Sequence, residues 1–163
     1  MASDEKRPGE VAAAVDPAVS ADDAAVVFIG RIRSPWASRE TCPKNLRRAR
    51  EDGRGAVVEL DPAWRGGLAG LRGQSHVVLL YWMHHARRDL IVQAPRHVGE
   101  PRGVFALRSP VRPNPIGLAT VRVVAIDESA GRIEIDAIDC VDGTPLVDIK
   151  PWLATIDGAE GAG

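Results

Sequence analysis

Short runs of β-branched and aliphatic residues, each closed by proline, glycine or aspartate, divide this chain along most of its length. Such runs predict β-strands, because these side chains suit a pleated sheet and the closing residues favour turns. The clearest runs are residues 25–33, 56–60, 76–82, 119–127 and 132–138. Within the last of them, strict alternation puts Ile133, Ile135 and Ala137 on one face of the predicted strand. The chain is therefore expected to be mainly β.

The segments between these runs contain little that predicts a long helix. Residues 62–71 predict one short helix that Asp61 could cap, and residues 36–54 predict a polar loop with at most one helical turn. Residues 104–107 and 147–149 predict two further short strands. Strands and helices do not alternate, which argues against a parallel doubly wound sheet. We therefore expect a closed or nearly closed antiparallel β-barrel of six or seven strands with one or two short helices.

The length of 163 residues predicts one domain. We place it at residues 24–155, between a disordered leader at residues 1–23 and a flexible tail at residues 156–163, because the leader is acidic and made of small residues. The chain shows no secretory signal and no apolar stretch long enough to span a membrane. Its only cysteines, Cys42 and Cys140, suit a reducing cytosol better than a disulfide framework, so a cytoplasmic protein is expected.

A proline-rich segment, RSPVRPNPIG at residues 108–117, holds three prolines within six residues. Each proline fixes its own φ and restricts the residue before it, so the segment should be rigid and extended. The side chains of Arg108, Ser109, Arg112 and Asn114 are then held in set directions, which favours ligand binding because little entropy is lost. The alternative is a proline-rich turn that only joins two strands.

A second segment, DGTPLVDIKPW at residues 142–152, begins with an Asp-Gly turn. The carboxylate and main-chain groups of such a turn can accept hydrogen bonds from ribose hydroxyls and an amino group. The alternative is an ordinary Asp-Gly hairpin in which Asp148 and Lys150 form a surface ion pair.

The usual motifs for nucleotide and metal binding are missing from the sequence. There is no G-x-G-x-x-G after a strand, no phosphate-binding P-loop and no G-x-S-x-G elbow, so a nucleotide cofactor would not be bound by a Rossmann turn. His84, His85 and His97 lie near Asp89, but neither H-x-x-x-H nor H-E-x-x-H spacing occurs. We therefore expect no metal site.

Basic residues concentrate in residues 84–112, which contain six arginines against two acidic residues. The net charge of −1 argues against a general nucleic-acid binder, but a locally basic face can still hold a polyanion. Residues 84–103 are also too long for a simple hairpin connection, and such loops are usually functional or mobile. We expect RNA phosphates to be bound by Arg87, Arg88, Arg96 and Arg102, the alternative being a solvated loop.

Several stretches, taken in order, resemble the TsaA-like family, which includes the TrmO-type tRNA (adenine-N6)-methyltransferases. They read IGRIRSPW, CPKN, GLAGLRGQSHVVLLYWMHH, GVFALRSPVRPNPIGL and DGTPLVDIKPWL, and they span residues 27–153. RSP-x-RPNPIGL and DGTP-x-x-DIKP are long and unusual motifs. The resemblance implies a β-barrel that binds S-adenosylmethionine and works as a homodimer. It also implies methyl transfer to N6 of N6-threonylcarbamoyladenosine, just 3′ of the anticodon in tRNA.

The resemblance also assigns individual residues. Pro43, Lys44 and Asn45 stand where the family usually reads Pro-Arg-Gln, and His84 and His85 stand where it reads His-Gln. Together with the two motifs, this predicts a set of cofactor-binding residues. The set is Pro43, Lys44, Asn45, His84, His85, Arg108, Ser109, Asn114, Pro115, Ile116, Gly117, Leu118, Asp142, Gly143, Thr144, Pro145 and Leu146.

For such a reaction we expect direct in-line displacement, because the sulfonium already provides the leaving group. The protein would hold the acceptor nitrogen roughly 3–3.5 Å from the methyl group, and neither a protein nucleophile nor a metal is required. A nitrogen beside a carbonyl must share or lose its proton before it reacts well. Tyr81, His84 and His85 are the candidates for that catalytic role, and the sequence does not choose among them.

The sequence departs from the family at Leu107, where threonine is usual, and at Trp152, where tyrosine is usual. Lys44 and Asn45 are shorter than the usual arginine and glutamine, and longer members add a further domain after the position of Leu153. The methyl acceptor is therefore left open to a small molecule or another RNA. A non-catalytic ligand-binding module and a metal-dependent hydrolase are the remaining alternatives.

Overall fold

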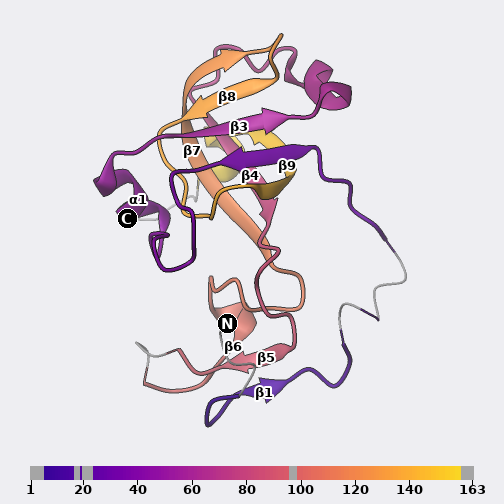
Figure 1. The fold of residues 1–163 in the computed structure, drawn as a ribbon, viewed down its shortest axis with the longest axis vertical. Helices are drawn as coiled ribbons and strands as arrows, with labels where there is room; N and C mark the ends of the chain where they lie inside the picture. Colours follow the sequence, from indigo (N-terminus) through magenta and orange to yellow (C-terminus); the bar gives the residue numbers. More distant parts are fainter. Residues whose placement is uncertain (1–5, 17–18, 20–23, 96–98, 159–163) are drawn as a thin grey trace. The chain divides into compact units, whose positions relative to one another are not determined.

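Six strands of the computed structural model close into an antiparallel β-barrel (Figure 1). The strands are β2 (Gly30–Arg33), β3 (Ala56–Leu60), β4 (His76–Trp82), β7 (Ile116–Asp127), β8 (Arg132–Ile135) and β9 (Thr144–Pro151). They follow one another around the barrel in the order β2-β3-β8-β7-β4-β9. The predicted fold class, a closed antiparallel barrel of six or seven strands with few short helices, is confirmed.

The structure describes residues 6–16, 19, 24–95 and 99–158. Its contacts divide the chain into two units. The barrel unit consists of residues 26–82 and 117–163, and the insert unit consists of residues 1–25 and 83–116. The sequence predicts a single domain over residues 24–155, and those boundaries stay a prediction.

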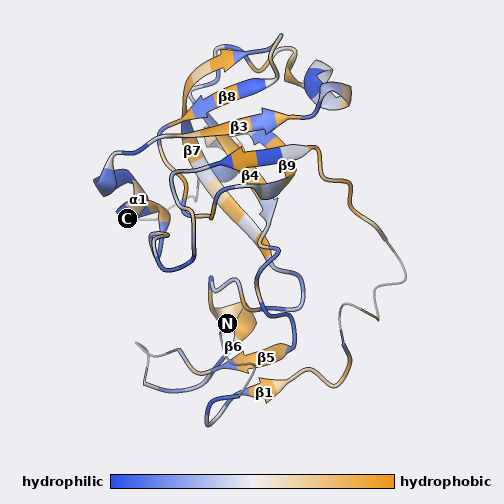
Figure 2. Ribbon diagram, in the orientation of Figure 1, coloured by the Kyte–Doolittle hydropathy of each residue, from blue (hydrophilic) through white to orange (hydrophobic). Residues whose placement is uncertain are grey.

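The barrel interior is aliphatic and follows the alternation of the sequence. Ile133 and Ile135 on β8 are buried, as the pattern of residues 132–138 predicts, and Ala137 just beyond the strand is buried with them. Val58 on β3 lies opposite Ile133 and is also fully buried. Figure 2 shows hydrophobic and hydrophilic residues mixed along the barrel strands, as expected when one face of each strand points inward and the other outward. Each such aliphatic side chain stabilises the fold by about 1.5–3 kcal/mol.

Helical structure in the barrel unit is short. The prediction of a polar loop with one helical turn over residues 36–54 is too short in helix, because α1 (Leu46–Asp52) has seven residues, about two turns, and is capped at both ends. The predicted helix over residues 62–71 is instead the 3-10 segment η1 (Pro62–Leu68), which contains two glycines. A helix of four residues, α2 (Ala154–Asp157), follows β9. No helix in the described ranges is long and apolar enough to cross a membrane.

The insert unit contains a three-stranded sheet in the order β1-β5-β6. Its strands are β1 (Val11–Ala12), β5 (Leu90–Gln93) and β6 (Arg102–Gly103), and a 3-10 turn, η2 (Val104–Ala106), follows β6. Two of these strands lie within residues 84–103, where the sequence predicts only a long loop. The expected strand at residues 104–107 is wrong, because the backbone turns at η2 and the Leu107 N–H donates to the Val104 carbonyl.

The described part of the predicted leader includes strand β1. Val11 lies opposite Val92 of β5, and the side chain of Glu10 is only 1% exposed. The Glu10 carboxylate accepts from the main-chain N–H of Arg7, from the Arg7 guanidinium and from the Ala94 N–H. Burial opposes ionisation of Glu10, but these hydrogen bonds outweigh it and lower its pKa. Residues 1–5, 17–18 and 20–23 of the leader, and 159–163 of the tail, lie outside the described residues.

Both chain connections from the barrel to residues 83–116 leave from adjacent strands. Strand β4 ends at Trp82, strand β7 begins at Ile116, and the two strands are neighbours in the barrel. At this end Gly117 lies against the ring of Tyr81, because a Cβ on Gly117 would come within 2.5 Å of three ring atoms. Glycine is therefore required at this position of the RPNPIGL motif by packing within the barrel.

Candidate functional site

The proline-rich motif and the DGTPLVDIKPW motif belong largely to different parts of the structure. Residues 108–116 of the proline-rich motif belong to the insert unit, whereas its last two residues, Gly117 and Leu118, belong to strand β7 of the barrel unit. The DGTPLVDIKPW motif lies wholly in the barrel unit.

Two arginines brace the proline loop, defined here as residues 108–115. The Arg112 guanidinium donates to the Val104 carbonyl at 2.6 Å and also to the Leu107 carbonyl. Arg88 Nε donates to the Pro113 carbonyl at 2.6 Å. The proline rings restrict the backbone torsions of the loop, and these hydrogen bonds hold its main chain in place as well.

The remaining polar groups of the proline loop divide into internal and exposed groups. Ser109 Oγ accepts from the Val111 N–H at 3.3 Å, so the hydroxyl stabilises the turn itself. The Pro115 carbonyl accepts from the Met83 N–H at 2.9 Å. Arg108 and Asn114, by contrast, are exposed. Of the predicted ligand-binding side chains in this loop, these two are the ones presented to solvent.

The DGTPL turn, residues 142–146, is tied into the barrel through main-chain groups. Gly143 has a φ of 77°, which favours glycine, and its N–H donates to the Ile32 carbonyl at 2.9 Å. Thr144 is buried, and its hydroxyl donates to the Val141 carbonyl at 2.7 Å. Pro145 lies opposite Arg31 on β2, and Leu146 is fully buried. Two of the five residues of this predicted cofactor segment, Thr144 and Leu146, are therefore also part of the barrel core.

Asp142 is the exposed acid of the DGTPL turn. Its carboxylate accepts from the Ser34 N–H at 3.1 Å and lies 3.6 Å from the Arg33 guanidinium, and 45% of the side chain remains exposed. Its main-chain N–H donates to the Trp36 carbonyl at 2.8 Å. The carboxylate is thus held in place and still has surface open to a hydrogen-bond donor.

The buried Tyr81, beside Gly117 in the barrel unit, pairs with the partly buried Asp139. The Tyr81 hydroxyl donates to Asp139 Oδ1 at 3.2 Å. Burial raises the pKa of Tyr81 far above its usual value, with the nearby Asp139 charge adding to the shift. Burial also raises the pKa of Asp139, against the effect of the Tyr81 hydrogen bond. The Tyr81 hydroxyl is therefore engaged as a hydrogen-bond donor to Asp139, and its catalytic role stays a prediction.

Sequence reasoning missed Asp139. It lies 58 residues from Tyr81 in the chain, and no motif marks it. The only signal is its position three residues before the DGTPL turn, in a segment whose neighbours Ile138 and Cys140 are buried. Burial likewise raises the pKa of the Cys42 thiol to about 11, and the Asp139 charge adds to this shift.

The PKN residues precede helix α1. Pro43 is half-buried and Lys44 is exposed. The Asn45 side chain accepts from the Arg48 N–H at 3.0 Å and is the N-cap of the helix. This predicted cofactor residue therefore has a structural role through its side-chain oxygen.

His84 and His85 are adjacent and exposed in the insert unit. Their rings lie 3.8 Å apart between centroids, at an angle of 44°. Among the described residues, no group of three or more histidines, cysteines, aspartates or glutamates is arranged to hold a metal ion.

The arginines predicted to bind RNA are engaged with neighbours in the insert unit. Arg87 forms two hydrogen bonds with Asp89, at 3.0 and 2.8 Å, and Arg102 pairs with Glu100 at 3.2 Å. Arg88 donates to the Pro113 carbonyl of the proline loop. Arg96 lies outside the described residues.

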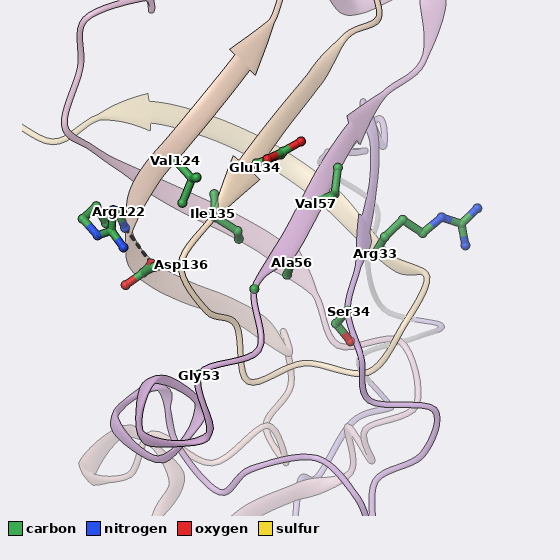
Figure 3. Close-up of a pocket in the computed structure, with 11 residues that line it drawn as sticks. Arg33, Ser34, Gly53, Ala56, Val57, Arg122, Val124, Glu134, Ile135 and Asp136 are labelled. Carbon is green, nitrogen blue, oxygen red and sulfur yellow. Dashed lines mark hydrogen bonds between the residues drawn. The ribbon is translucent and has the colours of Figure 1, made fainter.

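An open pocket lies in the barrel unit (Figure 3), and its lining includes Arg33 and Ser34, which contact Asp142. Its volume is about 490 Å³, and its walls come from the end of β2, from β3, β7 and β8, and from the chain after α1. Ala56, Val57 and Ile135 give it an apolar lining, while Arg122 and Asp136 add charged groups. None of the predicted cofactor-binding residues lines this pocket.

Comparison with known families matches residues 31–158 to the model described as the tRNA-methyltransferase O N-terminal domain. A probable S-adenosyl-L-methionine-binding protein, VirR, from Rhizobium radiobacter is 41% identical over 151 residues, which cover 93% of this chain and 82% of that protein. A mouse tRNA (adenine(37)-N6)-methyltransferase is 40% identical over 96 residues, which cover 57% of this chain and 22% of that protein.

The solved structure of TrmO from Pseudomonas aeruginosa is also similar. It superposes with a TM-score of 0.67 at 32% identity, over 87% of this chain and 62% of that chain. The chain therefore belongs to the family of the tRNA-methyltransferase O N-terminal domain. It spans less than two thirds of the solved TrmO chain and about a fifth of the mouse enzyme.

Proposed function

We propose that this protein is an S-adenosylmethionine-dependent methyltransferase that modifies tRNA. The proposed product is the N6-methylated form of N6-threonylcarbamoyladenosine, next to the anticodon. The observation that carries the proposal is membership of the tRNA-methyltransferase O family over residues 31–158. The naming of several relatives as S-adenosyl-L-methionine-binding proteins supports the choice of cofactor.

The exposed polar groups of the two motifs fit the chemistry of that cofactor. S-adenosylmethionine carries an ammonium group, a carboxylate and ribose hydroxyls, so it needs both acceptors and donors. In the barrel unit, the partly exposed Asp142 carboxylate provides an acceptor, and Leu118, 51% exposed, provides an apolar surface. In the insert unit, Arg108 is an exposed donor, and Arg112 Nε is a buried donor without an acceptor among the described residues.

When bound, the cofactor supplies an activated methyl group on its sulfonium, so the protein need not provide a nucleophile. The protein residues bind and orient. We propose that the Asp142 carboxylate accepts from the cofactor's ammonium group or ribose hydroxyls, and that the rigid backbone of the DGTPL turn lowers the entropy lost on binding. Arg108 is assigned to the cofactor by the family resemblance alone. Asp139 holds the proton of the Tyr81 hydroxyl in a hydrogen bond and so keeps the ring against Gly117. His84 and His85 remain the exposed candidates for sharing a proton with the acceptor.

The test is methyl transfer from labelled S-adenosylmethionine to total tRNA. The tRNA should come from two strains, one with and one without the threonylcarbamoyl modification of adenosine. We expect label in one nucleoside, N6-methyl-N6-threonylcarbamoyladenosine, after digestion and chromatography, and only with the modified tRNA. No label in any nucleoside would refute the tRNA methyltransferase.

A different methyl acceptor is the second candidate function. It is favoured by the coverage of the relatives: VirR, matched over 82% of its length, is named only for S-adenosylmethionine binding, whereas the mouse tRNA enzyme is matched over 22%. Equal labelling of tRNA with and without the threonylcarbamoyl group would favour another RNA acceptor. Cofactor binding without any transfer to RNA would favour a small-molecule acceptor or a non-catalytic ligand-binding module.

We also propose that the protein is a cytoplasmic homodimer. The family resemblance supports the dimer, and the two unbridged cysteines, Cys42 and Cys140, are compatible with a reducing compartment. Sedimentation equilibrium should give twice the chain mass, and fractionation of the source cells should place the protein in the cytoplasm. A monomer at micromolar concentration would contradict the first part of this proposal.

A further inference from the structure

We infer that the outward face of helix α1 and the residue preceding its cap form a surface that binds RNA phosphates. This α1 face consists of Lys44, Arg47 and Arg48. The inference rests on the proposed function in taking tRNA as the partner. It moves the expected phosphate contacts from the arginines of residues 84–112 to the barrel unit.

The orientation of the α1 face follows from what the helix buries. Ala49 is fully buried and Leu46 is partly buried, and both pack in one cluster with Trp36 and Ala137. Residues three apart share a face of a helix, so this pair fixes the inward side. Arg47 and Arg48 then point away from the core, and both are exposed; the Arg47 side chain is 83% exposed.

Both ends of the helix are fixed, so the face is presented at little entropic cost. Asn45 caps the N-terminus through its hydrogen bond from the Arg48 N–H. Gly53 ends the helix with a φ of 78°, and its N–H donates to the Arg50 carbonyl. Arg50 stays on the surface, but its guanidinium is already engaged: it donates to Asp136 at 2.9 Å and to the Thr120 carbonyl at 2.8 Å. Arg50 therefore anchors the helix and is not part of the α1 face.

The cations of the α1 face are available for a partner. Within the described part of the chain, no ion pair or side-chain hydrogen bond engages Lys44 or Arg48. Arg47 has one neighbour of opposite charge, Glu51, at 3.6 Å, and both side chains are mostly exposed. Such an exposed pair is worth little in water and can be replaced by a phosphate contact.

The α1 face shares its scaffold with the DGTPL turn of the proposed cofactor site. Trp36 packs against Ala49 of α1 and Ala137, and its carbonyl accepts from the Asp142 N–H at 2.8 Å. Trp36 Nε1 also donates to the Ile138 carbonyl at 2.7 Å. A substrate whose phosphates lie on the α1 face would therefore be bound within the same unit as the turn that carries Asp142. An RNA chain fits this chemistry because it offers regularly spaced anions together with the base to be modified.

The salt dependence of tRNA binding tests the inference. The double variant Arg47→Gln plus Arg48→Gln removes two cations from the α1 face. The matched control, Arg72→Gln plus Arg132→Gln, removes two exposed arginines that pair weakly with Glu128 and Glu59. Arg132 lies opposite Glu59, near the end of β3, whereas α1 leads into the beginning of that strand. Circular dichroism and the cofactor dissociation constant establish that both variants keep the fold and the cofactor site.

The quantity to measure is the slope of the logarithm of the tRNA association constant against the logarithm of the salt concentration. Each contact with a single-strand phosphate contributes about 0.7 to this slope, so loss of two contacts in the α1 variant should make it less steep by about 1.4. The control variant, and Arg102→Gln in the insert unit, should keep the wild-type slope. A wild-type slope in the α1 variant overturns the inference, as does an equal change in the control. Loss of binding to polyglutamate without a change for tRNA would assign the α1 face to an acidic protein and also overturn it.

The same preparations separate this inference from the proposed function. If the wild-type protein methylates tRNA but the α1 variant keeps its slope, the surface is wrong and the function stands. If the wild-type protein binds tRNA through the α1 face but transfers no methyl group, the function is wrong and the surface stands. If the wild-type protein shows no salt-dependent binding to tRNA, both are refuted.

Discussion

The proline loop leaves polar side chains exposed to solvent, whereas the DGTPL turn buries two of its side chains in the barrel. In the proline loop, stability comes from the proline rings and from carbonyls accepting from Arg88 and Arg112, so Arg108 and Asn114 are left exposed. In the DGTPL turn, Thr144 and Leu146 are buried in the barrel and Asp142 alone is an exposed acid. A motif can therefore be specific to a family because it presents groups to a ligand or because it completes a core. Mutations in the two motifs should separate these reasons.

The largest effect is expected at Leu146, the buried end of the DGTPL turn. Leu146→Ala should lower the free energy of unfolding by about 2–5 kcal/mol, because it leaves a cavity in the barrel. The matched change Leu118→Ala, at a side chain that is 51% exposed, should change it by no more than about 0.5 kcal/mol. Urea denaturation measures both. Similar losses of unfolding free energy at Leu146 and Leu118 would show that the DGTPL turn contributes no more to the barrel core than the end of the proline-rich motif does.

In the proline loop, the largest loss of stability is expected on replacing Arg112, whose guanidinium donates to two carbonyls before the loop. Arg112→Met should cost about 1–3 kcal/mol, because the Leu107 carbonyl loses its guanidinium donor and the Val104 carbonyl keeps only the Leu107 N–H. Hydrogen exchange at the Leu107 and Val111 amides should become faster. The control Arg108→Met should leave this exchange unchanged and weaken cofactor binding. Faster exchange in the control would contradict the division between bracing and exposed arginines.

A smaller effect is expected at Asn45, a predicted cofactor residue that caps α1. Asn45→Ala should lower the free energy of unfolding by about 1 kcal/mol through loss of the cap. Asn45→Asp keeps an acceptor for the Arg48 N–H and should restore most of that stability. Isothermal titration with S-adenosylmethionine provides the second measurement. If both variants bind the cofactor equally weakly, the Asn45 amide contacts it in addition to capping the helix.

The smallest effect is expected as a pH dependence at Asp139. Its pKa is raised in the folded protein, mainly by burial, so the ionised carboxylate favours the unfolded chain. Asp139 therefore contributes most to the free energy of unfolding below pH 3.8, the ordinary pKa of an aspartate. That contribution is lost as the pH rises through the higher pKa that Asp139 has in the folded protein. Asp139→Asn should be relatively more stable than the wild type at about pH 7 than at about pH 3.5. An identical difference in unfolding free energy at both pH values would refute the raised pKa.

Local sequence patterns predicted the barrel better than they predicted the insert. The alternation at residues 132–138 correctly identified Ile133 and Ile135 as core residues, because a strand with one buried face repeats every two residues. Residues 84–103 were expected to be a loop, yet they contain β5 and β6. Both strands are very short, and β5 is stabilised partly by pairing with β1, far away in sequence. No periodicity can show so short a strand.

In the candidate site, too, local sequence patterns predicted local features but not contacts between distant residues. The proline spacing and the Asp-Gly turn could be found in the sequence because rigidity and positive φ are local properties. The Tyr81–Asp139 pair could not, because its members are 58 residues apart and meet only when β4 and the chain before β9 close the barrel. The arginines at 87, 88 and 102 were expected to face RNA because they cluster in the sequence, yet each has a partner within the insert unit.

The proline loop and the turns were thus determined by the sequence itself, and so were the inward faces of the barrel strands. Backbone torsions and side-chain alternation depend on a residue and its immediate neighbours, so they can be read without a structure. The tertiary structure decided which polar groups are already occupied. It made Arg112 a brace and Asn45 a helix cap, while Lys44, Arg48, Arg108 and Asn114 were left exposed. Hydrogen bonds and burial depend on groups brought together by folding, and those groups decide which residues remain available to a ligand.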